Sequence, residues 1–278
     1  MFILLVGVAE DPVLQYFFQK HYVAKDSQVL FINVNRIGRD IDIDREGWSL
    51  PCGGRIKHHE VGAVYNRMLS RQTHQLQTYL SWLLDEQYPF VINRPKDTLT
   101  NFSKLWQLEY AKDFGFSIPD TEVKANGKVD MSRQDYIFKS ISSVRSIVHK
   151  VADNPKRQVH EPVLFQRDRG RENIRVHVLG NRCYAQKICS QAVDYRYDLT
   201  TPIAREFSLP AALRLQCLAL SKAVGLYFSG IDFIYQEDTF YFLEINPSPG
   251  YAYFEKQMIG SPISQQLFYT MKQTCQTG

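Results

Sequence analysis

Residues 230–247 contain the pattern that most constrains how this chain can fold. Two runs rich in β-branched and aromatic residues, 230–235 and 239–245, flank a polar segment at 236–238, and this predicts a β-hairpin. Glu244 and Asn246 are two positions apart on the second strand, so their side chains leave the same face. With a three-residue loop at 236–238, Asp232 lies opposite Phe242 and diagonal to Glu244. Such diagonal pairs are within about 7–8 Å at Cα.

This hairpin would bring two carboxylates and one amide oxygen together. Magnesium prefers oxygen ligands, and substrate phosphates can complete its octahedron at about 2.0–2.1 Å. The pattern therefore predicts Asp232, Glu244 and Asn246 as metal ligands. The alternative is an ordinary solvent-facing strand, and with Asp232 in register the two interpretations are about equally supported.

The first third of the chain has the pattern of a parallel α/β domain. Near-continuous apolar runs at 2–8 and 28–34 flank a helix-like segment at 11–23, as expected for a sheet covered on both faces. Arg94-Pro95 is a plausible boundary, because the residue before a proline disfavours helix. Short β-type runs and a well-punctuated helix at 210–224 follow, which predicts an α+β remainder. In that helix, Ser208 is the expected cap.

Composition argues against several classes of protein. The formal charge of +4 is small for 278 residues, and Lys and Arg are scattered, so we expect no nucleic-acid partner. The apolar start, 1–8, is too short for a membrane span and lacks the basic flank of a signal peptide, so we expect a cytoplasmic protein with no membrane partner. Five cysteines without a C-x-x-C pair suit reduced thiols. A homodimer remains open.

Gly230-Ile231-Asp232, followed by Phe-Leu-Glu-Ile-Asn-Pro-Ser-Pro-Gly at 242–250, resembles the C-terminal signature of ATP-grasp enzymes. It is most similar to ribosomal-protein glutamate ligases and other glutathione-synthetase-like ligases, and to the ligases that macrocyclise graspetide (microviridin-type) peptides. The resemblance implies an ATP-grasp fold, with a pre-ATP-grasp α/β domain at 1–95, a central subdomain at 96–160 and a C-terminal subdomain at 161–278. It also implies ATP and Mg²⁺ as cofactors, with Mn²⁺ as a substitute.

Two lysines resemble those that contact ATP phosphates in these families. Lys104 follows Asn101-Phe102-Ser103 at a helix start, and Lys139 ends the apolar run 136–138. A compact ammonium suits a phosphate as a point charge. Either lysine taken alone is better explained as a solvated surface residue, and its position relative to Asp232 and Glu244 is what supports the phosphate role.

Residues 164–167, which include Gln166 and Arg167, resemble the hinge strand whose backbone pairs with adenine. Residues 173–175 resemble an Asp-Ile-Arg triplet, which implies that Arg175 stabilises the transferred phosphoryl group and that Asn173 lies near the ribose. Asn173 stands where the family has Asp, which weakens the ribose assignment.

The phosphate-covering loop departs from the family pattern. These enzymes often have a glycine-rich flap, whereas this chain has Ser140-Ile-Ser-Ser-Val-Arg-Ser146. Ser142, Ser143 and Arg145 are candidates to hold phosphate; the alternative is a plain polar loop.

Two arginines are candidates for acceptor recognition. Arg196 lies in Asp194-Tyr195-Arg196, which resembles an Asp-aromatic-Arg segment of graspetide ligases, and it would orient the activated carboxylate. Arg67 ends a predicted strand of the first domain.

The resemblance predicts a carboxylate–amine or carboxylate–hydroxyl ligase that works through an acyl phosphate. The acceptor would be a peptide, protein or small-molecule carboxylate. Two other classes stay open: a small-molecule kinase of the same fold, and a nucleotide-dependent binding module without turnover.

Overall fold

The computed structural model describes residues 1–21, 28–51, 53–68, 74–124, 127–128, 132–142, 148–153, 158–159, 161–170, 172–190, 203–260 and 262–277. The chain divides into two compact units, Met1–Thr98 with Gly250–Gly278, and Leu99–Pro249. The first unit is therefore made of both ends of the chain. The predicted boundaries at 95 and 160 remain a prediction.

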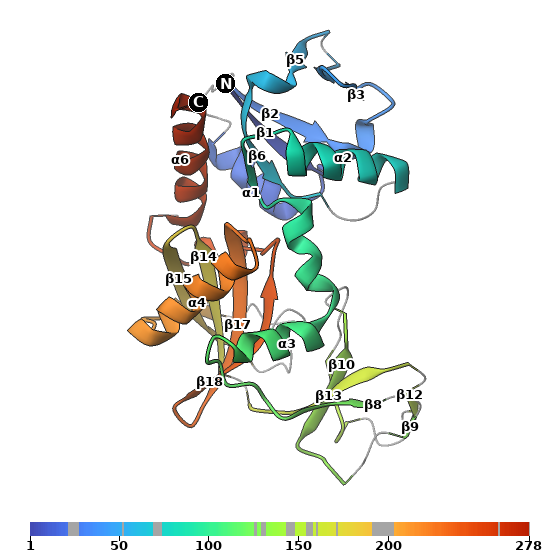
Figure 1. Ribbon diagram of the computed structural model, residues 1–278. Helices are drawn as coiled ribbons and strands as arrows, with labels where there is room; N and C mark the ends of the chain where they lie inside the picture. Colours follow the sequence, from blue (N-terminus) through green and yellow to red (C-terminus); the bar gives the residue numbers. More distant parts are fainter. Residues whose placement is uncertain are drawn as a thin grey trace. The chain divides into compact units, whose positions relative to one another are not determined.

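The first unit is built on a parallel sheet in the order β2-β1-β6-β7. Its strands are β1 (Phe2–Gly7), β2 (Val29–Asn33), β6 (Val61–Asn66) and β7 (Phe90–Ile92). Leu4, Val6 and Val64 share a buried cluster with helix α2 (His74–Glu86) on one face. On the other face, Phe17 of α1 (Pro12–His21) contacts Tyr65 and also Phe268 of α6 (Pro262–Thr277). Both faces are thus covered, as the apolar runs predict (Figure 1).

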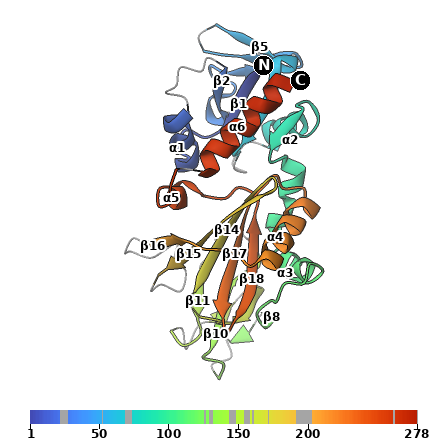
Figure 2. The same ribbon diagram turned by 90° about the vertical axis from the view of Figure 1, so that its left-hand side faces the viewer.

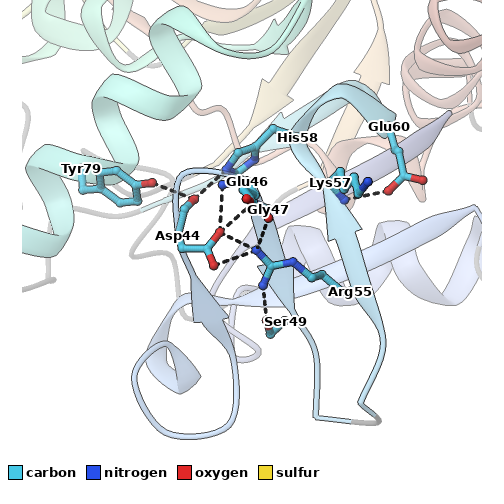
Figure 3. Close-up of polar contacts among 9 residues, drawn as sticks. All are labelled: Asp44, Glu46, Gly47, Ser49, Arg55, Lys57, His58, Glu60 and Tyr79. Atoms are coloured by element: carbon cyan, nitrogen blue, oxygen red, sulfur yellow. Dashed lines mark hydrogen bonds and ion pairs between the residues drawn. The ribbon is translucent and has the colours of Figure 1, made fainter.

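A small antiparallel sheet, β3-β4-β5, lies between β2 and β6 in the chain. Its strands are β3 (Asp42–Ile43), β4 (Gly47–Ser49) and β5 (Arg55–Lys57). Asp44 lies in the turn between β3 and β4 (Figure 3). Its carboxylate accepts from the backbone N–H groups of Glu46 and Gly47, at 2.8 and 3.1 Å, and from Arg55 Nη2 at 2.7 Å. These bonds, that to Arg55 first, lower the pKa of Asp44 to about 2.

The turn that contains Asp44 also contacts α2. The Asp44 carbonyl accepts a hydrogen bond from Tyr79 Oη and lies 2.9 Å from His58 Nε2 (Figure 3). The other ring nitrogen of His58 is 2.9 Å from Tyr88 Oη, which also accepts from Trp48 Nε1. Because these polar atoms find partners, the small sheet packs against the helix without leaving them unsatisfied.

The second unit contains an antiparallel sheet in the order β16-β15-β14-β17-β18. Its strands are β14 (Asn173–Leu179), β15 (Arg182–Cys189), β16 (Ile203–Glu206), β17 (Phe228–Gln236) and β18 (Thr239–Asn246). Helices α3 (Lys104–Lys112) and α4 (Ala211–Ala223) cover one face (Figure 2), where Ile174, Val176 and Phe233 are buried with Leu108 and Leu220.

A smaller antiparallel sheet in this unit has the order β11-β10-β13-β8. Its strands are β8 (Thr121–Lys124), β10 (Tyr136–Ser140), β11 (His149–Lys150) and β13 (Val163–Arg167), and β9 (Gly127–Lys128) pairs with β12 (Gln158–Val159). The remaining elements are α5 (Ala252–Glu255) and the 3₁₀ turns η1 (Val34–Arg36), η2 (His58–Glu60) and η3 (Pro95–Phe102).

Helix ends follow the sequence signals in part. Ser103 caps α3, its hydroxyl accepting from Trp106 N at 3.2 Å. Gly225, just after α4, has a positive φ of 75°, which suits the end of a helix. Gly115, just after α3, has a similar φ of 78°. The expectation of a Ser208 cap is wrong: Pro210 occupies the cap position, with no side-chain hydrogen bond. Proline has no polar side-chain atom, so the helix begins without a side-chain cap.

The predicted fold class, a parallel α/β N-terminal region followed by α+β regions, is confirmed. Among the described residues, no helix is both long and apolar enough to span a bilayer.

Candidate active site

The hairpin formed by β17 and β18 is present, but its turn is shorter than predicted. Gln236 pairs with Thr239, so only Glu237 and Asp238 form the turn, with positive φ values of 50° and 58°. Such a turn matches the right-handed twist of the flanking strands. The predicted three-residue loop is therefore wrong.

A β-bulge then changes the register. Phe233 pairs with Phe242, whereas Asp232 pairs with Glu244, which leaves Leu243 without a partner on β17. Without that extra residue, Glu244 would be opposite Ile231 and would project toward the apolar core. The bulge places Glu244 directly across from Asp232, not on the predicted diagonal, and on the same face.

The alternation of side chains along the strands identifies the face of the sheet that carries Asp232 and Glu244. Arg175 pairs with Asp232 across β14 and β17, and both alternate with buried apolar residues that pack beneath the helices. The polar side chains therefore project from the face opposite α3 and α4.

Charged contacts link the predicted metal ligands to two cations. Arg175 Nη1 donates to Asp232 Oδ2 at 2.5 Å, and Lys104 Nζ lies 3.6 Å from Glu244 Oε2. The side chains of Lys104 and Glu244 are only 2% and 9% exposed. Asn246 Nδ2 donates to Glu244 Oε1 at 3.1 Å and to Asp232 Oδ2 at 3.4 Å. Two carboxylates and two cations thus balance in a largely buried cluster, as burial of charge requires.

These residues fit a partial metal shell. No group of three or more His, Cys, Asp or Glu in the described part of the chain is arranged to hold a metal by itself. Two carboxylates and an amide leave positions for phosphate oxygens, which is how Mg²⁺ is usually bound next to a nucleotide. Turning the Asn246 amide by about 180° exchanges its nitrogen for its oxygen at the same place.

Lys104 also ties α3 to the end of β10. Its Nζ donates to Ser142 O at 3.1 Å, and its backbone N–H donates to Ile141 O at 2.8 Å. The Ser142 hydroxyl lies 3.3 Å from Ser140 Oγ. Ser142 therefore contacts the charged cluster through its backbone carbonyl, a group that leaves no signal in the sequence.

Lys139 and Gln166 share one face of the smaller sheet. Lys139 pairs with Leu164, two positions before Gln166, and is 7% exposed. Gln166 Nε2 donates to Thr121 Oγ1 at 2.8 Å. Arg167 leaves the other face and is half exposed, in ion pairs with Asp135 at 3.1 Å and Asp120 at 3.7 Å.

Asn173 is buried at the start of β14, two positions before Arg175 and hence on the same face. Ser143, Arg145 and Arg196 lie outside the described residues. Arg67, in the other unit, forms a buried ion pair with Asp11 at 2.7 Å, and Asp11 also accepts from Val13 N in the first turn of α1.

Two residues that were not among the predicted site residues shape the cluster. A Cβ added to Gly230 would lie 2.5 Å from Arg175 Nη2 and 2.8 Å from Pro249 Cβ, so a side chain there has no room. Gln107 of α3 binds the backbone of Ile245, 138 positions away. The glycine belongs to the quoted signature, but no local pattern connects Gln107 to the hairpin.

Comparisons with known proteins agree with this architecture. The macrocyclase MdnC from Microcystis aeruginosa MRC, in complex with the precursor peptide MdnA, has a TM-score of 0.77 at 20% identity, over 98% of this chain and 100% of MdnC. A RiPP-associated ATP-grasp ligase from Chryseobacterium gregarium, with ADP and a leader and core peptide, has a TM-score of 0.75 at 19% identity, over 100% of this chain and 98% of that one.

A more distant structure, D-alanine–D-alanine ligase from Bacillus anthracis with ATP, has a TM-score of 0.60 at 13% identity, over 100% of this chain and 98% of that one. A search of curated proteins finds no matching sequence. The model of the RimK-like ATP-grasp domain matches residues 131–271, just over half of the chain, and includes Lys139, Arg175 and the whole hairpin. The chain therefore belongs to the RimK-like ATP-grasp family.

Proposed function

We propose that this chain is an ATP- and Mg²⁺-dependent ligase that joins a peptide carboxylate to an amine or a hydroxyl through an acyl phosphate. The observation that carries the proposal is the convergence of Asp232, Glu244 and Asn246 with Arg175 and Lys104, in a chain of this family. Oxygen ligands and cations side by side suit a metal-bound polyphosphate better than a neutral ligand.

The chemistry has two steps. A carboxylate oxygen of the acceptor attacks the γ-phosphorus, the bond from this phosphorus to the bridging oxygen breaks, and ADP leaves. The nitrogen or oxygen nucleophile then attacks the acyl carbon, loses its proton and displaces phosphate. When bound to Asp232, Glu244 and Asn246, Mg²⁺ would neutralise charge on the phosphate oxygens.

The chain's own cations would act on the same charge. Lys104 and Arg175 contact the carboxylates, and when Asp232 and Glu244 hold Mg²⁺ the N–H groups of both cations would be available to phosphate. Lys139 would add a third positive charge. Ser142, Ser143 and Arg145 would contact the phosphates, Gln166 and Asn173 would flank the nucleotide, and Arg167 would contribute through the backbone of the hinge strand.

A peptide acceptor is proposed because two similar folds were solved with peptides. MdnC is described with its precursor peptide, and the C. gregarium ligase with a leader and core peptide. Arg196 is the residue proposed to orient the activated carboxylate.

The test is to incubate the full chain with ATP, Mg²⁺ and short acidic peptides encoded beside its gene, and to analyse products by mass spectrometry and nucleotide chromatography. The expected products are ADP, phosphate and a peptide lighter by one water per bond. Asp232→Asn and Glu244→Gln should each lower turnover by about two orders of magnitude or more. Glu237→Gln, the same change at an exposed position of the turn, should leave it unaltered.

Other products would replace the proposal. A peptide that gains a glutamyl residue would indicate a glutamate-adding ligase, and one that keeps phosphate would indicate a kinase. Binding of ATP without turnover on any acceptor would favour a binding module.

A further inference from the structure

Gln107 uses both the nitrogen and the oxygen of its side-chain amide to hold one residue of the metal hairpin. Its Nε2 donates to Ile245 O at 2.9 Å, and its Oε1 accepts from Ile245 N at 3.1 Å. The side chain is buried in α3, three residues after Lys104, and α3 lies beside β18 (Figure 1). Gln107 therefore makes the hydrogen bonds to Ile245 that the backbone of a neighbouring strand would otherwise make.

This contact lies on the outer edge of the sheet. β18 is the last strand in the order β16-β15-β14-β17-β18, so alternate backbone groups point away from β17. Before the bulge, Phe242 N donates to Ser117 O at 2.8 Å. After the bulge, Gln107 binds Ile245. The edge of β18 is thus held on both sides of Leu243.

The position of the Gln107 contact along β18 matters for the metal ligands. Ile245 lies between Glu244 and Asn246, and the register at Leu243 decides which face Glu244 takes. A one-residue slip sends every later side chain to the opposite face, and a bulge is a locally weakened part of the ladder. A contact that fixes the backbone at Ile245 therefore also fixes where both oxygen ligands point.

We propose that Gln107 is a positioning residue that holds the bulged register of β18 and so keeps Glu244 and Asn246 beside Asp232. The inference rests on the proposed function, because it assigns Gln107 to the metal site of that function. Lys104 and Gln107 then act together from one helix: Lys104 contacts the Glu244 side chain and Gln107 the next backbone unit.

The test compares Gln107→Met with Gln216→Met. Methionine keeps the length and apolar packing of glutamine but removes both hydrogen bonds to Ile245. Gln216 of α4 also donates to a backbone carbonyl, that of Gly115 at 3.2 Å, and is the matched control. The readouts are Mn²⁺ binding in the presence of ADP, by electron paramagnetic resonance, and hydrogen exchange of the Ile245 amide.

We expect Gln107→Met to weaken Mn²⁺ binding by about 10–100-fold, the usual effect of losing a residue that orients metal ligands. The Ile245 amide should exchange faster, while Gln216→Met keeps wild-type values in both measurements. If Gln107→Met does not fold, Gln107→Glu, which keeps the acceptor but loses the donor, takes its place.

Equal Mn²⁺ affinity in the wild type and the folded Gln107 variant would overturn the inference. An equal loss in Gln216→Met would also overturn it, because the effect would then be general destabilisation. These readouts do not depend on ligation. A chain that joins no peptide but shows the expected loss of Mn²⁺ binding would end the proposed ligase function and leave the role of Gln107 standing.

Discussion

At the scale of residues, the charged cluster depends on Gly230, which has no side chain. Gly230 pairs with Asn246 on β18, and the guanidinium of Arg175 lies where a Cβ would be. Pro249 closes the same space from the other side. Arg175 is 5% exposed and is bonded to Asp232, so it has little room to move aside.

Gly230→Ala should displace the Arg175 guanidinium from Asp232, because the new methyl group would overlap it. We expect turnover to fall by about 10²-fold, the scale of effect of a misplaced charged group, with ATP affinity less affected. Steady-state kinetics and calorimetry with an ATP analogue measure the two effects. Gly250→Ala is the control, since no atom lies within 4 Å of a Cβ added there. Similar kinetics in both variants would show that the close approach is not needed.

At the scale of elements, α1 and α6 are joined by stacked aromatic rings. His21 at the end of α1 stacks on Phe268 of α6, with ring centroids 4.7 Å apart, and also contacts Phe17 at 4.7 Å. Burial lowers the pKa of His21 from 6.5 to about 4, although Glu255 acts in the opposite direction. The packed form of this pair of helices therefore contains the neutral imidazole.

This shift predicts a pH dependence of stability. In the unfolded chain His21 takes up a proton below about pH 6.5, whereas in the folded chain it does so only near pH 4, so the unfolded state binds more protons in between. The free energy of unfolding should fall as the pH drops from 6.5 to 4. His21→Phe keeps an aromatic ring against Phe268 and should flatten this part of the curve in urea titrations.

His59→Gln, at an exposed position, is the control and should keep the wild-type slope. A slope that is the same in His21→Phe and the wild type would assign the acid sensitivity to carboxylates elsewhere.

At the scale of the whole molecule, the first unit is completed by the last residues of the chain. α6 packs against β6 and β1, and its residues Ile263, Leu267 and Met271 are fully buried. Residues 250–278 thus continue directly from the metal hairpin, yet their core is the N-terminal sheet.

Leu267→Ala should destabilise the first unit by about 2–5 kcal/mol, the usual cost of a leucine-sized cavity. We expect faster hydrogen exchange in β1 and β6, measured by mass spectrometry of peptides. Tyr269→Ala, at a side chain that is 56% exposed, should change stability by no more than about 0.5 kcal/mol. Unchanged exchange in β1 and β6 would mean that α6 contributes little to this sheet.

Much of the architecture could be predicted from local patterns. The apolar runs at β1 and β2 predict buried parallel strands, Asn101 or Ser103 predicts the start of α3, and the alternation in 230–247 predicts the hairpin. These signals lie within a few residues of the features they specify, so the sequence contains them whole. The signature at 230–250 also predicts the family, which the RimK-like domain model confirms.

The sequence by itself thus determined the elements, the family and the identity of the charged residues. Only the tertiary structure decided how they meet: the bulge at Leu243 that turns Glu244 toward Asp232, the contact from Gln107 to Ile245 and the packing of α6 on the first sheet. The physical reason is distance along the chain. A bulge is selected by what packs on both faces of a strand, and a side chain that bonds 138 positions away leaves no periodic trace.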